Sequence, residues 1–320
     1  MRPADIPWGS PMRRLSIGKA AGCSWVALTM MLAGCAAPAR QAVVPMRLPE
    51  YAGIRHDTPY VFKACAKGAT LAYVGVRHSR SLQDESIAAV MNEIAEASPT
   101  IVLVEGAVPA VSPSLEDAAQ TWGESGVAAY LARARGVTVA SLEGSLAEQA
   151  TDLRQAFGGD KVIAFYGLRA IAQERGRAQS VFDLGAFLDK RLLPWLYKNS
   201  VTAQVLSVDA FRAVVARVTG MNDAASAPES RWFDPLAEGD LFGFRTMSGH
   251  LVSARDITMA NRLVKSVLDG GRVLAVAGYS HVVMQEPAIR YQLACKGWSG
   301  SGVMRSSPSI ARCDETCGAE

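Results

Sequence analysis

The chain lacks the features that mark nucleic-acid binding, internal repeats or a membrane span. It has 320 residues, only four histidines and a net charge of +3, and residues 1–34, with four basic side chains against one acidic, account for that charge. The remainder is close to neutral, which excludes the concentrated basic face that nucleic-acid binding requires. No glycine-rich segment matches a phosphate-binding loop. No apolar run is long enough to span a bilayer.

The N-terminus has the pattern of an export signal. Basic residues precede an apolar stretch at residues 20–33, which ends in Leu32-Ala33-Gly34-Cys35. This ending resembles the lipobox of bacterial lipoproteins, in which the signal is cut before the cysteine and the cysteine carries the lipid. A plain secretory signal with an incidental cysteine is the alternative. We predict a signal peptide at residues 1–34, lipidation at Cys35, and anchoring to a bacterial membrane, by resemblance the outer membrane facing the periplasm.

Export would place the mature chain where disulfides persist. Two bridges with three connectivities are possible among the cysteines that follow the lipidation site, and the simplest joins Cys295 to the tail. These cysteines are Cys65, Cys295, Cys313 and Cys317. Prolines at residues 35–55 predict a tether between lipid and domain. We predict a single domain at residues 56–306 and a peripheral tail at residues 307–320.

Short apolar runs alternate with helix-like apolar stripes along this domain. The order is typical of an α/β fold, so we predict a mostly parallel sheet flanked by helices. At about residues 168–250 the pattern turns mostly helical, which we interpret as an insertion that forms a wall or a lid. Asp84 is placed to cap a helix with apolar positions at Ile87, Val90, Met91 and Ile94. The runs predicted as strands are 72–74, 101–104, 137–139, 162–165 and 274–277.

Two signatures of the same form each follow a predicted strand. They are Gly75-Val76-Arg77-His78 and Gly278-Tyr279-Ser280-His281, and Glu105 directly follows the 101–104 strand. Ligands of open α/β sheets bind at the carboxyl edge of the strands, where these three side chains would meet if the strands are parallel. Two imidazoles and a carboxylate are the ligand types of hydrolytic metal sites. The alternatives are histidines that bond loop backbone and a Glu105 paired with Arg77.

Other charged residues are candidates for supporting roles. Glu124 is placed at a helix start, Glu143 follows the 137–139 strand, and Arg255-Asp256 are expected to open the helix before the last strand. Arg169 is expected to open the helix after the 162–165 strand. Each position alone is weak support, because charged residues also favour the first turns of helices for structural reasons.

These motifs carry a family resemblance. The chain resembles the TraB, GumN and Tiki group over about residues 68–290, and more distantly ChaN-like and erythromycin-esterase-like proteins. Tiki members are regarded as metal-dependent peptidases. By similarity, His78, Glu105 and His281 would be metal ligands or catalytic groups, and Arg255 would orient substrate or stabilise an oxyanion. Arg77 departs from the family motif, which often has a small residue or Glu there, and its charge would repel a metal unless Glu105 or Glu124 neutralises it.

The function that we predict is a metal-dependent hydrolase, peptidase- or esterase-like, of the cell envelope. A divalent metal on His78, Glu105 and His281 would activate water, and Glu143 or Glu124 would take the proton. The substrate would be an envelope peptide or small molecule. The first alternative is a non-catalytic lipoprotein that binds haem, a metal complex or another envelope ligand in the same cleft. The second is an esterase with Ser280 as nucleophile, although Val282 replaces the second glycine of a nucleophile elbow.

Overall fold

The computed structural model of the protein describes residues 44–66, 68–177, 182–223, 225 and 228–297. The predicted signal peptide, the lipidation site at Cys35 and the tail at 307–320 lie outside the described residues. Cys65 lies in the first strand, whereas the side chains of the other cysteines lie outside the described part, so the disulfide pairing stays a prediction. No helix in the described part of the chain is both long and apolar enough to cross a bilayer.

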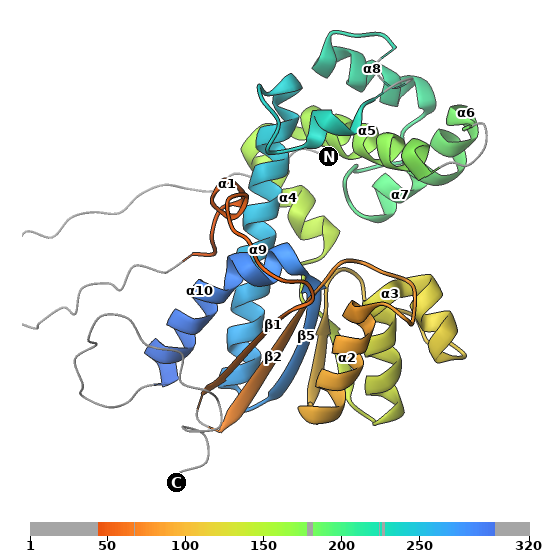
Figure 1. The fold of residues 1–320 in the computed structure, drawn as a ribbon. Coiled ribbons are helices and arrows are strands. Elements are labelled where there is room, and N and C mark those ends of the chain that lie inside the picture. Colours follow the sequence, from red (N-terminus) through yellow and green to blue (C-terminus); the bar gives the residue numbers. More distant parts are fainter. Residues whose placement is uncertain (1–43, 67, 178–181, 224, 226–227, 298–320) are drawn as a thin grey trace, which may run out of the picture. The chain divides into compact units, whose positions relative to one another are not determined.

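One five-stranded sheet forms the centre of an α/β fold, as predicted (Figure 1). The spatial order is β1-β2-β5-β3-β4, with β1 antiparallel to β2 and all other neighbours parallel. The strands β2 and β5 are therefore neighbours although β3 and β4 lie between them in the sequence. The bounds are β1 Tyr60–Ala66, β2 Ala69–Val76, β3 Ile101–Val104, β4 Thr138–Ser141 and β5 Arg272–Gly278.

Helices cover both faces of the sheet. On one face α2 (Glu85–Glu96) and α3 (Leu115–Ala134) pack against alternate strand residues such as Val74 and Val102. On the other, α9 (Phe244–Leu268) and α10 (Tyr279–Gly297) pack against residues such as Tyr73 and Leu103. Because strand side chains alternate between the two faces, a strand buried on both sides is apolar throughout, which is the pattern of β2 and β5.

The helix α2 shows why the local prediction worked. The side chain of Asp84 accepts a hydrogen bond of 2.8 Å from the Ser86 backbone N–H and so caps the helix. Ile87, Val90 and Ile94 are buried on one face, as their spacing predicts. Met91, which was assigned to the same face, is 36% exposed, so that assignment was wrong.

A second, mostly helical part has an apolar core of its own. Phe165, Leu168, Leu196 and Phe211 are buried there together with Phe244, the first residue of α9. Its elements are α4 Leu146–Phe157, α5 Gly159–Arg177, α6 Leu184–Phe187, the π-helix η1 Leu188–Leu192, α7 Leu193–Lys198, α8 Val208–Thr219, and the 3-10 helices η3 Ser230–Phe233 and η4 Leu241–Gly243. The short α1 (Leu48–Tyr51) precedes the sheet.

Several predicted boundaries were wrong. The run 162–165 lies inside α5 and is not a strand, because a helix buried on most sides is also apolar over four residues. Arg169 accordingly lies within α5, and Arg255-Asp256 lie in the middle of α9 rather than at its start. The strand β1 was not predicted, since the apolar Val61 lies on its exposed side and the sequence does not alternate clearly between apolar and polar residues.

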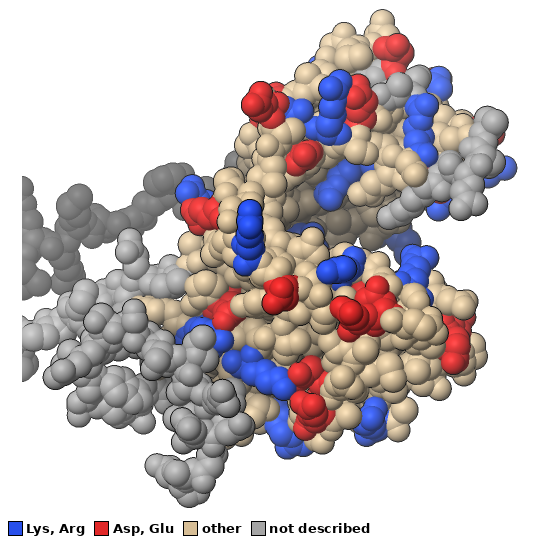
Figure 2. Space-filling view, in the orientation of Figure 1, with Lys and Arg blue, Asp and Glu red and all other residues tan. Residues whose placement is uncertain are grey.

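Charges of both signs are mixed on the surface. On the face drawn in Figure 2, Lys and Arg side chains are interspersed with Asp and Glu side chains over the described residues. That face therefore carries no continuous basic surface of the kind that nucleic-acid binding requires.

Candidate functional site

The two G-x-x-H motifs lie side by side at the carboxyl edge of the sheet. In the parallel pairing of β2 with β5, Val76 is opposite Gly278. Each motif's glycine makes room for the other motif: a Cβ on Gly75 would lie 2.8 Å from the Cα of Tyr279, and a Cβ on Gly278 would lie 2.8 Å from Nε2 of His78. Gly75 is therefore required by close packing against the backbone of the other motif, whereas a side chain at Gly278 would displace the His78 ring.

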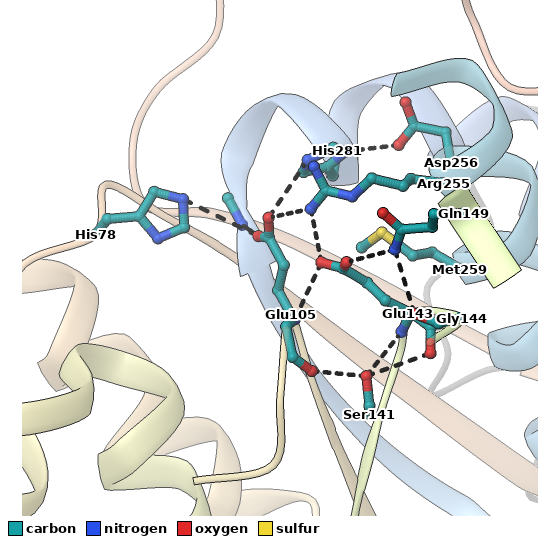
Figure 3. A network of polar contacts seen from close by, with 12 residues as sticks. His78, Glu105, Ser141, Glu143, Gly144, Gln149, Arg255, Asp256, Met259 and His281 are labelled. Carbon is teal, nitrogen blue, oxygen red and sulfur yellow. Dashed lines mark hydrogen bonds and ion pairs between the residues drawn. The ribbon is translucent and has the colours of Figure 1, made fainter. Parts of the chain in front are cut away.

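Glu105 lies at the centre of the site and connects both histidines (Figure 3). Its Oε2 accepts a hydrogen bond of 2.6 Å from the Gly278 N–H and lies 4.0 Å from Nε2 of His78. Its Oε1 accepts a hydrogen bond of 2.9 Å from Nη2 of Arg255 and lies 3.5 Å from Nε2 of His281. The structure thus brings together His78, Glu105 and His281, the three residues chosen from the sequence.

Glu105 is held in its ionised form. Burial by itself would raise the pKa of this carboxyl group, but His281, the Gly278 N–H and Arg255 together hold it well below its usual range. The carboxylate is therefore a fixed negative charge that orients the groups around it.

His281 is buried between two carboxylates. Its Nδ1 lies 2.6 Å from Oδ1 of Asp256, on the side of the ring opposite Glu105. Burial alone would lower the pKa of this imidazole, but hydrogen bonds and charge from Asp256 and Glu105 raise it to about 9. Both ring nitrogens face acceptors, so the ring is an imidazolium at neutral pH.

Two residues outside the sequence-based prediction hold Asp256 in place. The Nε2 of Gln285 donates a hydrogen bond of 2.6 Å to Oδ1 of Asp256, and the buried Tyr73 hydroxyl donates to Oε1 of Gln285 at 3.1 Å. The spacing of four residues between His281 and Gln285 on α10 was a usable signal, because it places both side chains on one helix face. Tyr73 gave no comparable signal within its apolar strand.

His78 occupies a different environment from His281. Its backbone has a φ of 67° and 66% of its side chain is exposed. The following residue, Ser79, donates its backbone N–H to Oε1 of Glu124 at 2.6 Å. Glu124 is buried directly after a kink in α3 at Gly123, and burial raises its pKa. Glu124 thus supports the loop that carries His78, and no hydrogen bond between described residues joins it to Glu105.

Arg255 joins Glu105 to the second carboxylate of the site. Its Nη2 donates hydrogen bonds to Oε1 of Glu105 and, at 2.6 Å, to Oε1 of Glu143. Glu143 also accepts the Gly106 N–H at 3.0 Å. Burial lowers the pKa of Arg255, but the two carboxylates outweigh this effect and raise it. Glu105 is therefore paired with Arg255 and not with Arg77, which is exposed.

Ser280 is poorly placed as a nucleophile. It lies in the first turn of α10, and no hydrogen bond joins it to His78 or His281 within the described residues. Activation of a serine requires a base within hydrogen-bond reach. The geometry therefore gives the serine-esterase alternative no support.

The donor set around Glu105 fits a divalent metal only in part. Nε2 atoms of His78 and His281 face the same carboxylate, and Asp256 orients His281 as carboxylates orient metal-bound histidines. Both oxygens of Glu105 are, however, already hydrogen-bonded. Within the described residues, no group of three or more His, Cys, Asp or Glu side chains is arranged to hold a metal ion. The metal stays a prediction.

Comparison with known proteins gives no further identification. No family model matches the chain, no curated protein matches it in sequence, and no solved structure matches it. The resemblance to the TraB, GumN and Tiki group therefore stays a prediction that rests on the motifs.

Proposed function

We propose that this protein is a hydrolase of the bacterial cell envelope that cleaves an amide or ester bond at the carboxyl edge of its sheet. The observation that carries the proposal is the convergence of two histidines of unlike environment on one ionised carboxylate, Glu105. One imidazole is accessible to water and the other is buried as an imidazolium. Hydrolysis needs one group that accepts a proton and one that donates a proton.

The roles follow from exposure and hydrogen bonding. His78 is exposed and takes a proton from the attacking water, and the negative charge of Glu105 at 4.0 Å stabilises the resulting imidazolium. His281 carries a proton on Nε2 and donates it to the leaving group or bonds the developing oxyanion. Asp256 fixes the orientation of His281 through Nδ1, which is the part an aspartate has beside a catalytic histidine.

The test is a panel of peptide and ester substrates assayed with wild-type protein and with His78→Asn. Asparagine is chosen because it tolerates the positive φ at this position. We expect hydrolysis by the wild-type protein and a loss of about a hundredfold or more in kcat/KM for the variant. The control is Gln83→Ala, which removes an exposed side chain of the same loop. A co-purifying ligand together with no turnover anywhere in the panel would favour the non-catalytic binding protein.

The same assay decides the part of a metal. If a divalent ion bound at His78 and His281, it would lower the pKa of a coordinated water. Loss of activity in EDTA and its return with Zn²⁺ or Mn²⁺ would support the predicted metal centre. Activity that EDTA leaves unchanged would support chemistry by the side chains alone.

The proposed location rests on the lipobox-like sequence that ends at Cys35. A lipid anchor would keep the domain at the membrane surface, within reach of envelope peptides and other small molecules. We expect labelled palmitate to be incorporated into the wild-type chain and not into Cys35→Ser. Equal labelling of both chains would contradict the anchor.

A further inference from the structure

Arg255, which bonds Glu105, and Tyr166 of α5 each carry a buried hydrogen-bonding atom that lacks a partner. The Oη of Tyr166 and the Nε of Arg255 are both buried and have no hydrogen-bond partner in the described part of the protein. The Cζ of Arg169 lies 5.8 Å from the centre of the Phe165 ring, but Arg169 makes no hydrogen bond or ion pair to any described residue. In native structures such groups are nearly always satisfied, so their lack of partners needs an explanation.

The three side chains act on one another electrostatically. Tyr166 and Arg169 are three residues apart on α5 and therefore lie on the same side of that helix. Burial lowers the pKa of Arg169, and the positive charge of Arg255 lowers it further. Burial raises the pKa of Tyr166 to about 12, against the opposing effect of Arg169 and Arg255. Because such effects fall with distance, α5 and α9 present these three groups to a common region.

The region combines positive charge with unused hydrogen-bond donors. Both acceptors of Arg255 bind its Nη2, which leaves Nε unused, while Arg169 has no carboxylate partner in the described residues. Arg255 also lines a cavity of about 360 Å³ between α4 and α9, whose other lining residues include Gln149, Glu148 and Asp152 but neither Tyr166 nor Arg169. One anionic ligand would satisfy two guanidinium groups that repel each other and a tyrosine hydroxyl.

We propose that Tyr166, Arg169 and Arg255 form a binding site for an oxyanion, a carboxylate or phosphate group of the substrate. Arginine matches both groups, since its planar fork pairs with two oxygens at once. Arg255 belongs to this site and also bonds Glu105. The anionic group of the substrate therefore lies close to the bond that is cut. That the anion belongs to a substrate rests on the proposed hydrolase. Anion binding itself does not.

Calorimetric titration of the full chain with sodium phosphate and with sodium acetate, at constant ionic strength in chloride, tests the site. We expect saturable binding of one of the two anions by the wild-type protein. Arg169→Gln should weaken it about tenfold or more, and Tyr166→Phe by less, because it removes one neutral donor. The matched control, Arg175→Gln, removes an exposed charge from the same helix and should bind as the wild type does. Stronger binding of phosphate than of acetate identifies a phosphate group, and the reverse identifies a carboxylate.

Two results would overturn the anion site. One is the absence of saturable binding of either anion to the wild-type protein, and the other is unchanged binding by both Arg169→Gln and Tyr166→Phe. Circular dichroism shows whether each variant is folded, and Tyr166→Phe keeps the test valid if Arg169→Gln is not.

Kinetics separate this inference from the proposed function. For a substrate that the protein hydrolyses, Arg169→Gln should raise KM about tenfold for an anionic form and leave KM for its neutral analogue unchanged. Anion binding without hydrolysis of any substrate would refute the hydrolase and keep the anion site. Hydrolysis with equal KM values in wild type and Arg169→Gln would refute the anion site and keep the hydrolase.

Discussion

The two G-x-x-H motifs have the same sequence pattern, yet they place their histidines in opposite environments. The side chain of His281 is 10% exposed and bonded to Asp256, whereas the side chain of His78 is 66% exposed. The backbone that follows the glycine of each motif causes the difference. The residues after Gly278 enter α10 at once, and that helix packs against α9, while the residues after His78 form a loop before α2. A shared motif therefore places two backbones side by side without giving the two side chains the same chemistry.

Changing Glu105, the carboxylate that lies between the two histidines, should have the largest effect. Glu105→Gln removes the charge that both histidines share, and we expect kcat/KM to fall about a thousandfold on any substrate that the panel identifies. Steady-state kinetics measures the loss. Glu116→Gln, an exposed glutamate of α3, is the control and should retain wild-type activity. Retention of activity by Glu105→Gln would show that the two motifs do not act through this residue.

We expect the two histidines to contribute very differently to stability, although both contribute to activity. His281→Asn breaks a buried pair and leaves Asp256 without its partner, so we expect a loss of about 3 kcal/mol in the free energy of unfolding. His78→Asn changes an exposed side chain and should stay within about 0.5 kcal/mol of wild type. Urea denaturation measures both. Equal losses in the two variants would mean that the two environments are not as different as the contacts imply.

Asp256 bonds His281, so changing it should act on one of the two histidines. Asp256→Asn keeps the size of the side chain but removes the charge that raises the pKa of His281, so this pKa should fall while the His78 loop is unaffected. We expect kcat/KM to fall about a hundredfold. NMR titration of the histidine ring signals measures the pKa. A variant with normal activity and an unshifted His281 signal would contradict the positioning role.

Stability should also depend on pH through His281. The folded-state pKa of about 9 lies above the ordinary value of 6.5, so the folded state binds the proton more tightly than the unfolded chain does. This contribution is fully present below about pH 6.5 and is lost as the pH rises through about 9. Urea midpoints between pH 6 and 10 measure the decline. His281→Asn should remove this component of it, and an identical decline in the variant would assign it to other groups.

The smallest expected effect comes from Gly278, whose lack of a side chain leaves room for His78. In Gly278→Ala the new methyl group would lie 2.8 Å from Nε2 of His78 and 3.5 Å from Oε2 of Glu105. His78 is exposed and has room to move away, so we expect about a tenfold loss of kcat/KM and little loss of stability. A melting temperature near that of wild type together with reduced activity would support this. Full activity would show that the position of the His78 ring is not critical.

Part of this fold was predictable from local patterns. The α/β class, the strands at 101–104 and 274–277 and the capped helix after Asp84 follow from periodicity, capping and short apolar runs, which depend on neighbours in sequence. The run at 162–165 was mistaken for a strand because a fully buried helix and a buried strand look alike over four residues. The placement of His78, Glu105 and His281 at strand ends was equally local, and it was enough to select them.

Local sequence showed which side chains follow the strands, because each apolar run and the residue that ends it are adjacent along the chain. Three features depend on how distant segments pack together: β2 and β5 are neighbours, Arg255 rather than Arg77 pairs with Glu105, and Asp256 makes His281 an imidazolium. These contacts join residues that are distant in sequence, and burial sets their strength. Burial is a property of the packed protein, so no segment of the sequence contains it.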